Sequence, residues 1–148
     1  MNFRTMAAAD QQVLIAGAVI AITALISFVD PAGSWGGIML VSLFAGVAAV
    51  YVALQPQVAP AMRLPMTKGL SLLVLGAAST AASVIALLTY IGYVFRFLTD
   101  VYVLLFLVGL VASIFLLWIG WRAYKAESGA TAAPPPPPAA APPAPPAA

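Results

Sequence analysis

The feature that most constrains this chain is the spacing of its charges. Only ten of the 148 residues are charged, and they separate four long uncharged runs, residues 13–29, 36–54, 69–95 and 101–121. A helix needs about 20 mostly apolar residues to cross roughly 30 Å of hydrocarbon. Each run is apolar on all sides rather than along one stripe, as in helices that face lipid or other helices. We therefore predict four transmembrane helices, the third long enough to require tilt.

Composition excludes the competing fold classes. The chain is 64% hydrophobic and 7% charged, whereas soluble domains are about 25% charged. Too few polar residues remain to cover four such helices in water. A membrane β-barrel would show alternating segments of about ten residues instead of continuous apolar runs. The predicted fold is an all-α antiparallel four-helix transmembrane bundle over residues 13–125, preceded by a cytoplasmic segment, residues 1–12.

The connections support this division. Asp30-Pro31-Ala32-Gly33 has the pattern of a type I turn. Prolines 56, 60 and 65 predict an extended second loop over residues 55–68. Thr99 or Asp100 is expected to cap the fourth helix with its side-chain oxygen. The first run resembles a signal peptide but lacks a small-residue cleavage site, so we interpret it as an uncleaved anchor.

The distribution of Lys and Arg predicts the orientation. Arg96 alone lies on the side of the first and third loops, and five basic residues lie on the side of the termini: Arg4, Arg63, Lys68, Arg122 and Lys125. The positive-inside rule therefore places both termini in the cytoplasm. The Ala-rich composition, with more Arg than Lys, favours a bacterial cytoplasmic membrane. Arg63, Lys68, Arg122 and Lys125 form a predicted inner basic rim that sets topology and attracts anionic lipid.

The end of the chain differs in character from the rest. We assign residues 126–148 to a tail, because residues 130–148 contain only Ala, Pro and one Thr. Such a segment is expected to be disordered or to form polyproline II helix. It is either a ligand for a proline-binding groove, or an arm toward a partner, or an uninvolved tether.

Small residues recur at helical spacing inside the spans. They are Ser42 and Gly46 in the second run, Gly76, Ser79, Thr80 and Ser83 in the third, and Gly109 and Ser113 in the fourth. Small residues four apart let helix backbones approach closely. These residues either pack the helices of this bundle together or dock another protein, a flat lipid or a pigment, with the third helix as the expected docking face.

Arg96 and Asp100 lie four residues apart at the predicted outer end of the third helix. That spacing predicts a local ion pair, worth about 0–1 kcal/mol when exposed. The alternative is that Arg96 contacts a lipid phosphate or a carboxylate of a partner.

The chemistry available to the chain is limited. The sequence has no Cys and no His, and no charged residue lies at the centre of a span. Thiolate nucleophiles and Cys/His metal sites are thereby excluded, and the intramembrane charges typical of pumps and voltage sensors are lacking. We expect no enzyme activity, metal, cofactor or nucleic-acid binding.

These observations lead to one functional hypothesis and two alternatives. The hypothesis is a non-catalytic accessory or assembly subunit of a larger membrane protein complex, surrounded by membrane lipids. It would dock through its small-residue helix faces, with the Pro-rich tail as a second docking element. The first alternative is a self-assembling homo-oligomeric scaffold or simple pore. The second is an enzyme or transporter whose site forms only with a partner.

Overall fold

Four long helices and one short helix make up the protein. In the computed structural model, residues 6–29, 36–58 and 66–131 are described. The helices are α1 (Ala8–Val29), α2 (Gly36–Val58), α3 (Lys68–Thr89), α4 (Ile91–Arg96) and α5 (Val101–Thr131). The long helices have 22 to 31 residues, which at 1.5 Å per residue is about 33 to 46 Å. All four are long and apolar enough to cross a membrane.

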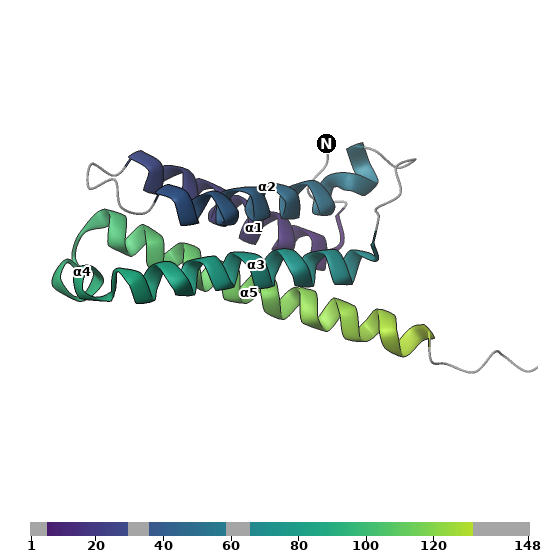
Figure 1. Ribbon diagram of the computed structural model, residues 1–148. Coiled ribbons are helices and arrows are strands. Elements are labelled where there is room, and N and C mark those ends of the chain that lie inside the picture. The colour runs from purple at the N-terminus through teal and green to yellow at the C-terminus, as the bar shows by residue number, and fades with distance from the viewer. Residues whose placement is uncertain (1–5, 30–35, 59–65, 132–148) are drawn as a thin grey trace, which may run out of the picture.

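The long helices form an antiparallel bundle. Figure 1 shows α1 and α2 lying over α3 and α5, with α4 at one end and the start of α1 at the other. Each long helix packs on two neighbours, in the cyclic order α1, α2, α3, α5. The predicted all-α four-helix bundle is thus confirmed, and no strand occurs in the described parts of the chain.

The third span ends earlier than the predicted residue 95. α3 stops at Thr89, Tyr90 leaves helical geometry with φ −111° and ψ 22°, and the six residues of α4 follow. Thr89 donates its hydroxyl to the carbonyl of Ile85 at 2.7 Å, a bond that tends to bend helices. The 22 residues of α3 already reach across about 33 Å, so the remaining apolar residues are not needed for the crossing.

Three helices run further than predicted. α1 begins at Ala8, five residues before the predicted start of the first span and inside the segment predicted as residues 1–12. α2 continues to Val58 and holds Pro56 in its last turn, where the missing N–H removes only one late helical hydrogen bond. α5 continues to Thr131, although residues 126–131 were assigned to the tail. Alanine, lysine and glutamate are good helix formers, which favours the continuation of α5 past the predicted boundary. Arg4, the turn at Asp30–Gly33 and the remaining tail, residues 132–148, lie outside the described residues.

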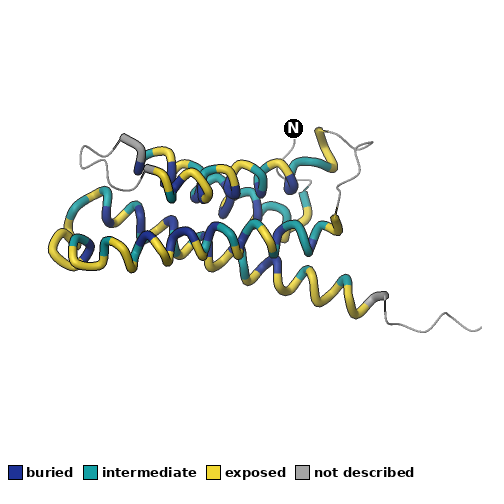
Figure 2. Tube along the Cα trace, viewed as in Figure 1, coloured by how far each residue is buried: buried dark blue, intermediate teal, exposed yellow. Residues whose placement is uncertain are grey.

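The core has two apolar clusters with a polar layer between them. The first cluster centres on Ile20, Leu72 and Leu116, and the second on Met39, Val103 and Phe106. Along each helix, small polar residues occupy the level between the two clusters. Figure 2 shows the buried residues turned toward the helix interfaces and the exposed ones turned outward. The outward side chains are mostly large and apolar, as expected of a surface in contact with lipid.

Candidate functional site

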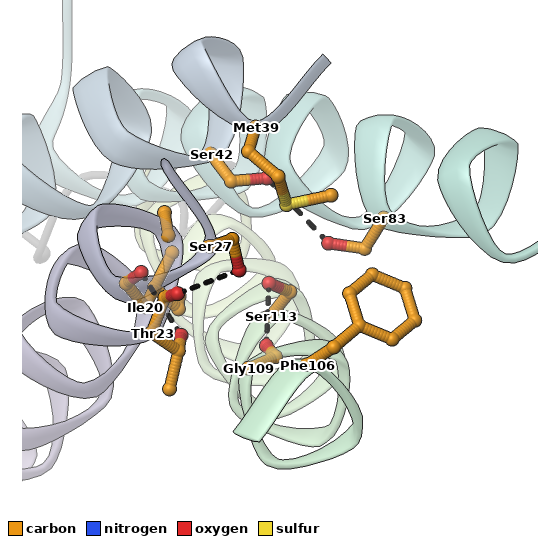
Figure 3. A pocket seen from close by; sticks show the side chains of 10 residues that line it. Ile20, Thr23, Ser27, Met39, Ser42, Ser83, Phe106, Gly109 and Ser113 are labelled. Atoms are coloured by element: carbon orange, nitrogen blue, oxygen red, sulfur yellow. Dashed lines mark hydrogen bonds between the residues drawn. The ribbon is translucent and has the colours of Figure 1, made fainter. Parts of the chain in front are cut away.

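Six buried hydroxyl groups meet at the centre of the bundle, and we call them the hydroxyl layer. They belong to Thr23 and Ser27 of α1, Ser42 of α2, Ser79 and Ser83 of α3, and Ser113 of α5, and none is more than 8% exposed. Figure 3 shows several of them pointing toward one another. All four long helices therefore contribute polar groups at one depth of an otherwise apolar interior.

Hydrogen bonds inside the hydroxyl layer join α3 to both of its neighbours. The Ser79 and Ser113 oxygens are 2.8 Å apart, and Ser113 also donates to the carbonyl of Gly109 at 2.9 Å. Since Ser113 has only one hydrogen, Ser79 must donate to Ser113. The Ser42 and Ser83 oxygens are 3.5 Å apart, at the limit of a hydrogen bond. Such interhelical bonds hold membrane helices together in the absence of a hydrophobic driving force.

The hydroxyls of α1 bond within their own helix. Thr23 donates to the carbonyl of Val19 at 2.8 Å, and Ser27 donates to the carbonyl of Thr23 at 2.8 Å. Both residues line the cavity described next, and a hydroxyl that donates one hydrogen bond can still accept another. The α1 side of the hydroxyl layer therefore offers hydrogen-bond acceptors. Ser42 and Ser83, by contrast, have two hydroxyl hydrogens and share only one long hydrogen bond.

A small cavity lies within the hydroxyl layer (Figure 3). Thr23, Ser27, Ser42, Ser83 and Ser113 line it with apolar neighbours, and its volume for the centre of a water-sized sphere is about 10 Å³. That volume accommodates one water molecule, which needs two to four polar partners. The cavity is therefore suited to a single water and is too small for a substrate or a pigment.

The predicted small-residue positions lie inside the bundle. Seven of the eight are buried, and Thr80 is partly buried. A methyl group on Gly46 would lie 2.7 Å from the backbone nitrogen of Ala21, and one on Gly76 would lie 2.6 Å from the Cα of Leu117. These distances are too short for real contacts, so the backbones of α2 and α1, and of α3 and α5, approach closely. The structure uses these faces for contacts between helices of the same chain.

Sequence reasoning missed several members of these interfaces. Gly17, Gly69 and Gly120 also lie against backbone of a neighbouring helix, and Thr23 and Ser27 complete the hydroxyl layer. The spacing of seven residues between Gly69 and Gly76 was a usable signal, because it keeps both on one helix face. Isolated hydroxyls in α1 gave no comparable signal.

The predicted ion pair between Arg96 and Asp100 is wrong. In the part of the chain that the structure describes, the ion pair observed joins Lys68 to Asp10 instead. α4 ends at Arg96, so helical spacing does not continue to Asp100. Asp100 accepts a hydrogen bond from the backbone N–H of Tyr102 at 2.8 Å, which confirms its predicted capping role. The Arg96 guanidinium lies 5.8 Å from the ring centre of Phe97.

The inner basic rim divides into two parts. Arg63 lies outside the described residues. Lys68 is held between helices by its ion pair with Asp10 of α1. Arg122 and Lys125 of α5 instead stack over tryptophan rings, Arg122 at 4.8 Å from Trp118 and Lys125 at 5.0 Å from Trp121.

Carboxylates at this end face the interhelical contacts. Glu127 of α5 accepts a hydrogen bond from the backbone N–H of Gly69 at 2.8 Å, at the start of α3, where negative charge is favourable. Asp10 binds Lys68. The two cations of α5, by contrast, are exposed on the outside of the helix.

The described residues contain no cluster of three or more side chains able to hold a metal ion. Comparisons of the chain with protein-family models, with curated proteins and with solved structures found no match. The geometry defines a bundle of four long helices that are apolar enough to cross a membrane.

Proposed function

We propose that this chain is a non-catalytic accessory or assembly subunit of a larger membrane protein complex. The observation that carries the proposal is the length of α5. Its 31 residues extend about 46 Å, whereas about 20 residues suffice to cross the hydrocarbon. Figure 1 shows its last turns projecting past the other helices. A rigid helical arm beyond the membrane suits a subunit that reaches toward another protein.

The composition beyond the arm extends this reach. Residues 132–148 are Ala and Pro, a composition that favours polyproline II helix with a rise of about 3.1 Å per residue. On the arm itself, the side chains of Tyr124, Ala126 and Ser128 are exposed. A partner on this side of the membrane therefore has both a polar helical surface and a proline-rich ligand available to it.

The interior supports a structural role rather than a transport role. The hydroxyl layer has room for about one water molecule, and the small-residue faces are filled by helices of the same chain. A pore would thus have to form between several copies of the chain. We further infer that the arm and both termini lie in the cytoplasm of a bacterium, because the basic residues collect at that end.

The test is a crosslink from the arm, combined with the mass of the intact complex. A photoreactive amino acid replaces exposed Ala126, and the matched control places it at Val111 of α5, which is 65% exposed at the level of the lipid. We expect Ala126 to crosslink to one foreign membrane protein, present in a fixed ratio by native mass spectrometry. Removal of residues 132–148 should lower the yield of that complex.

Two outcomes would contradict the proposal. A closed ring of identical chains, crosslinked to one another from Val111, would establish the self-assembling scaffold or pore. A monomer with measurable turnover or ion flux in liposomes would establish an autonomous activity.

A further inference from the structure

Along one face of α5, the exposed side chains change from apolar to aromatic to basic. A phospholipid changes in the same order from its acyl chains to its headgroup. Ile114 lies deepest in the membrane, Trp118 and Trp121 follow, and Arg122 and Lys125 come last. Counted from Trp118, Ile114 and Arg122 are four residues away, Trp121 is three and Lys125 is seven. All five positions therefore share one side of the helix. All five side chains are exposed. The stripe therefore runs from apolar through amphipathic to cationic.

Two grooves flank this stripe and meet at Trp118. An apolar groove of about 360 Å³ lies between α3 and α5, where it is lined by Leu73, Ile114, Leu117, Trp118 and Trp121. A more polar groove of about 340 Å³ lies between α1 and α5, with Gln12, Trp118 and Arg122 among its lining residues. The first has the lining expected for an acyl chain. The second offers a cation and an amide at the depth of a headgroup.

The expected depth of these α5 residues in the membrane agrees with the apolar-to-cationic order of the stripe. α5 begins at Val101, directly after Asp100, and about 20 residues later the helix leaves the hydrocarbon. That position coincides with Trp121, and tryptophans favour the interface. Arg122 and Lys125 then lie at the level of lipid phosphates.

Charge decides which lipid fits. Among the residues described, the carboxylates near this end are engaged toward α3, Asp10 with Lys68 and Glu127 with the N–H of Gly69. Arg122 and Lys125 form no ion pair within the described part of the chain, and each is positioned instead over a tryptophan ring. A guanidinium beside a groove binds a phosphate well, and clustered basic residues attract anionic headgroups.

We propose that this end of α5 is a binding site for one anionic glycerophospholipid. Its phosphate binds Arg122, with Lys125 and Gln12 beside it, and an acyl chain lies along Trp118 in the apolar groove. This site is independent of the proposed function, because a lipid can bind whether or not the arm meets a protein partner.

The test uses the site's own tryptophans as reporters. The chain has three Trp residues, and Trp35→Phe leaves fluorescence from Trp118 and Trp121 alone. This variant is reconstituted in vesicles containing brominated phosphatidylglycerol or brominated phosphatidylcholine, whose bromines quench tryptophan on contact. We expect phosphatidylglycerol to bind more tightly by roughly fivefold for each engaged basic residue. Native mass spectrometry should show one retained phosphatidylglycerol per chain.

Substitutions separate a specific site from general attraction to an anionic surface. Arg122→Gln and Lys125→Gln together should bring the preference for phosphatidylglycerol close to one, whereas Arg96→Gln at the other end of the bundle should leave it unchanged. The sharpest control is Arg122→Gln with Gly129→Lys. Gly129 has open space around it, and the moved charge lies about 10 Å further along the axis.

The moved charge should not restore binding if the site is local. Recovery of the preference by Gly129→Lys would overturn the proposal, since net charge alone would then explain it. Equal binding of the two lipids to the Trp35→Phe protein would overturn it as well. Neither result depends on the presence of a partner protein. Failure of the lipid-site proposal can therefore be distinguished from failure of the proposed subunit role.

Discussion

Ser113 illustrates how single residues organise the interior of the bundle. Its oxygen accepts from Ser79 at 2.8 Å and its hydrogen goes to the carbonyl of Gly109 at 2.9 Å. Both serines are fully buried. Loss of the Ser79 side chain and loss of the Ser113 side chain therefore have different consequences, because the hydrogen in the bond between them belongs to Ser79. Without Ser79, Ser113 still donates to Gly109, whereas without Ser113, the hydroxyl of Ser79 loses its acceptor.

We expect this asymmetry in a double-mutant cycle. Ser79→Ala should lower the free energy of unfolding by about 0.6 kcal/mol, typical of a hydrogen bond between membrane helices. Ser113→Ala should cost more, roughly 1–3 kcal/mol, because it leaves a buried donor unsatisfied. The double substitution should cost less than Ser113→Ala alone. Unfolding by dodecyl sulfate in mixed micelles measures all three, and strictly additive effects would contradict the expected coupling.

At the scale of the elements, α3 and α5 are held at a backbone-to-backbone approach. A methyl group on Gly76 would lie 2.6 Å from the backbone nitrogen of Leu117, and one on Gly120 would lie 2.5 Å from that of Leu73. Backbone atoms cannot rotate away as a side chain does. Even the smallest added side chain must therefore push the two helices apart.

Gly76→Ala should accordingly destabilise the bundle by roughly 1–3 kcal/mol, the usual effect of overpacking. The matched control is Gly129→Ala, since nothing lies within 4 Å of the position of its added methyl group. That substitution should stabilise α5 by up to about 1 kcal/mol through helix propensity. Thermal unfolding in detergent compares the two, and equal effects would show that the glycines act through propensity instead of packing.

The elements also show how far sequence alone reaches. Hydropathy locates the four spans because crossing the membrane demands a long apolar run from any helix. The residue at which a helix ends depends on other interactions, including contacts with distant parts of the chain. α5 passes residue 126 with Glu127 bonded to Gly69, 58 residues earlier in the chain, and no local pattern encodes such a contact. The predicted pairing of Arg96 with Asp100 was wrong because α4 ends at Arg96 and the chain turns before it reaches Asp100.

For the candidate sites, sequence indicated residue types more reliably than partners. The spacing of Ser79, Ser83 and Ser113 predicted close packing, and these serines do lie at helix contacts. Which helix each meets follows from the cyclic order of the bundle, which hydropathy does not determine. Lys68 and Arg122 looked equivalent as members of one rim, yet one is paired with Asp10 and the other lies over Trp118.

At the scale of the whole molecule, the two ends of the bundle differ chemically. One end holds Asp10, Lys68, Arg122, Lys125 and Glu127, and it includes both the start of α1 and the end of α5 (Figure 1). The other end holds α4 with Arg96, and Asp100 at the start of α5. Basic residues resist translocation across the membrane, so the positive-inside rule predicts that the end with more of them faces the cytoplasm.

This orientation is directly testable because the chain has no cysteine. Single cysteines are introduced by Gly129→Cys at the arm and by Phe97→Cys, a side chain 41% exposed after α4. With a membrane-impermeant maleimide, we expect Phe97→Cys to react while the membrane that holds the protein is intact. Gly129→Cys should react only after that membrane is opened. The reverse pattern would place the arm outside and would move the lipid site to the opposite leaflet. Because the arm and the basic residues of α5 belong to the same end of that helix, this single measurement fixes the compartment of any partner that the arm meets.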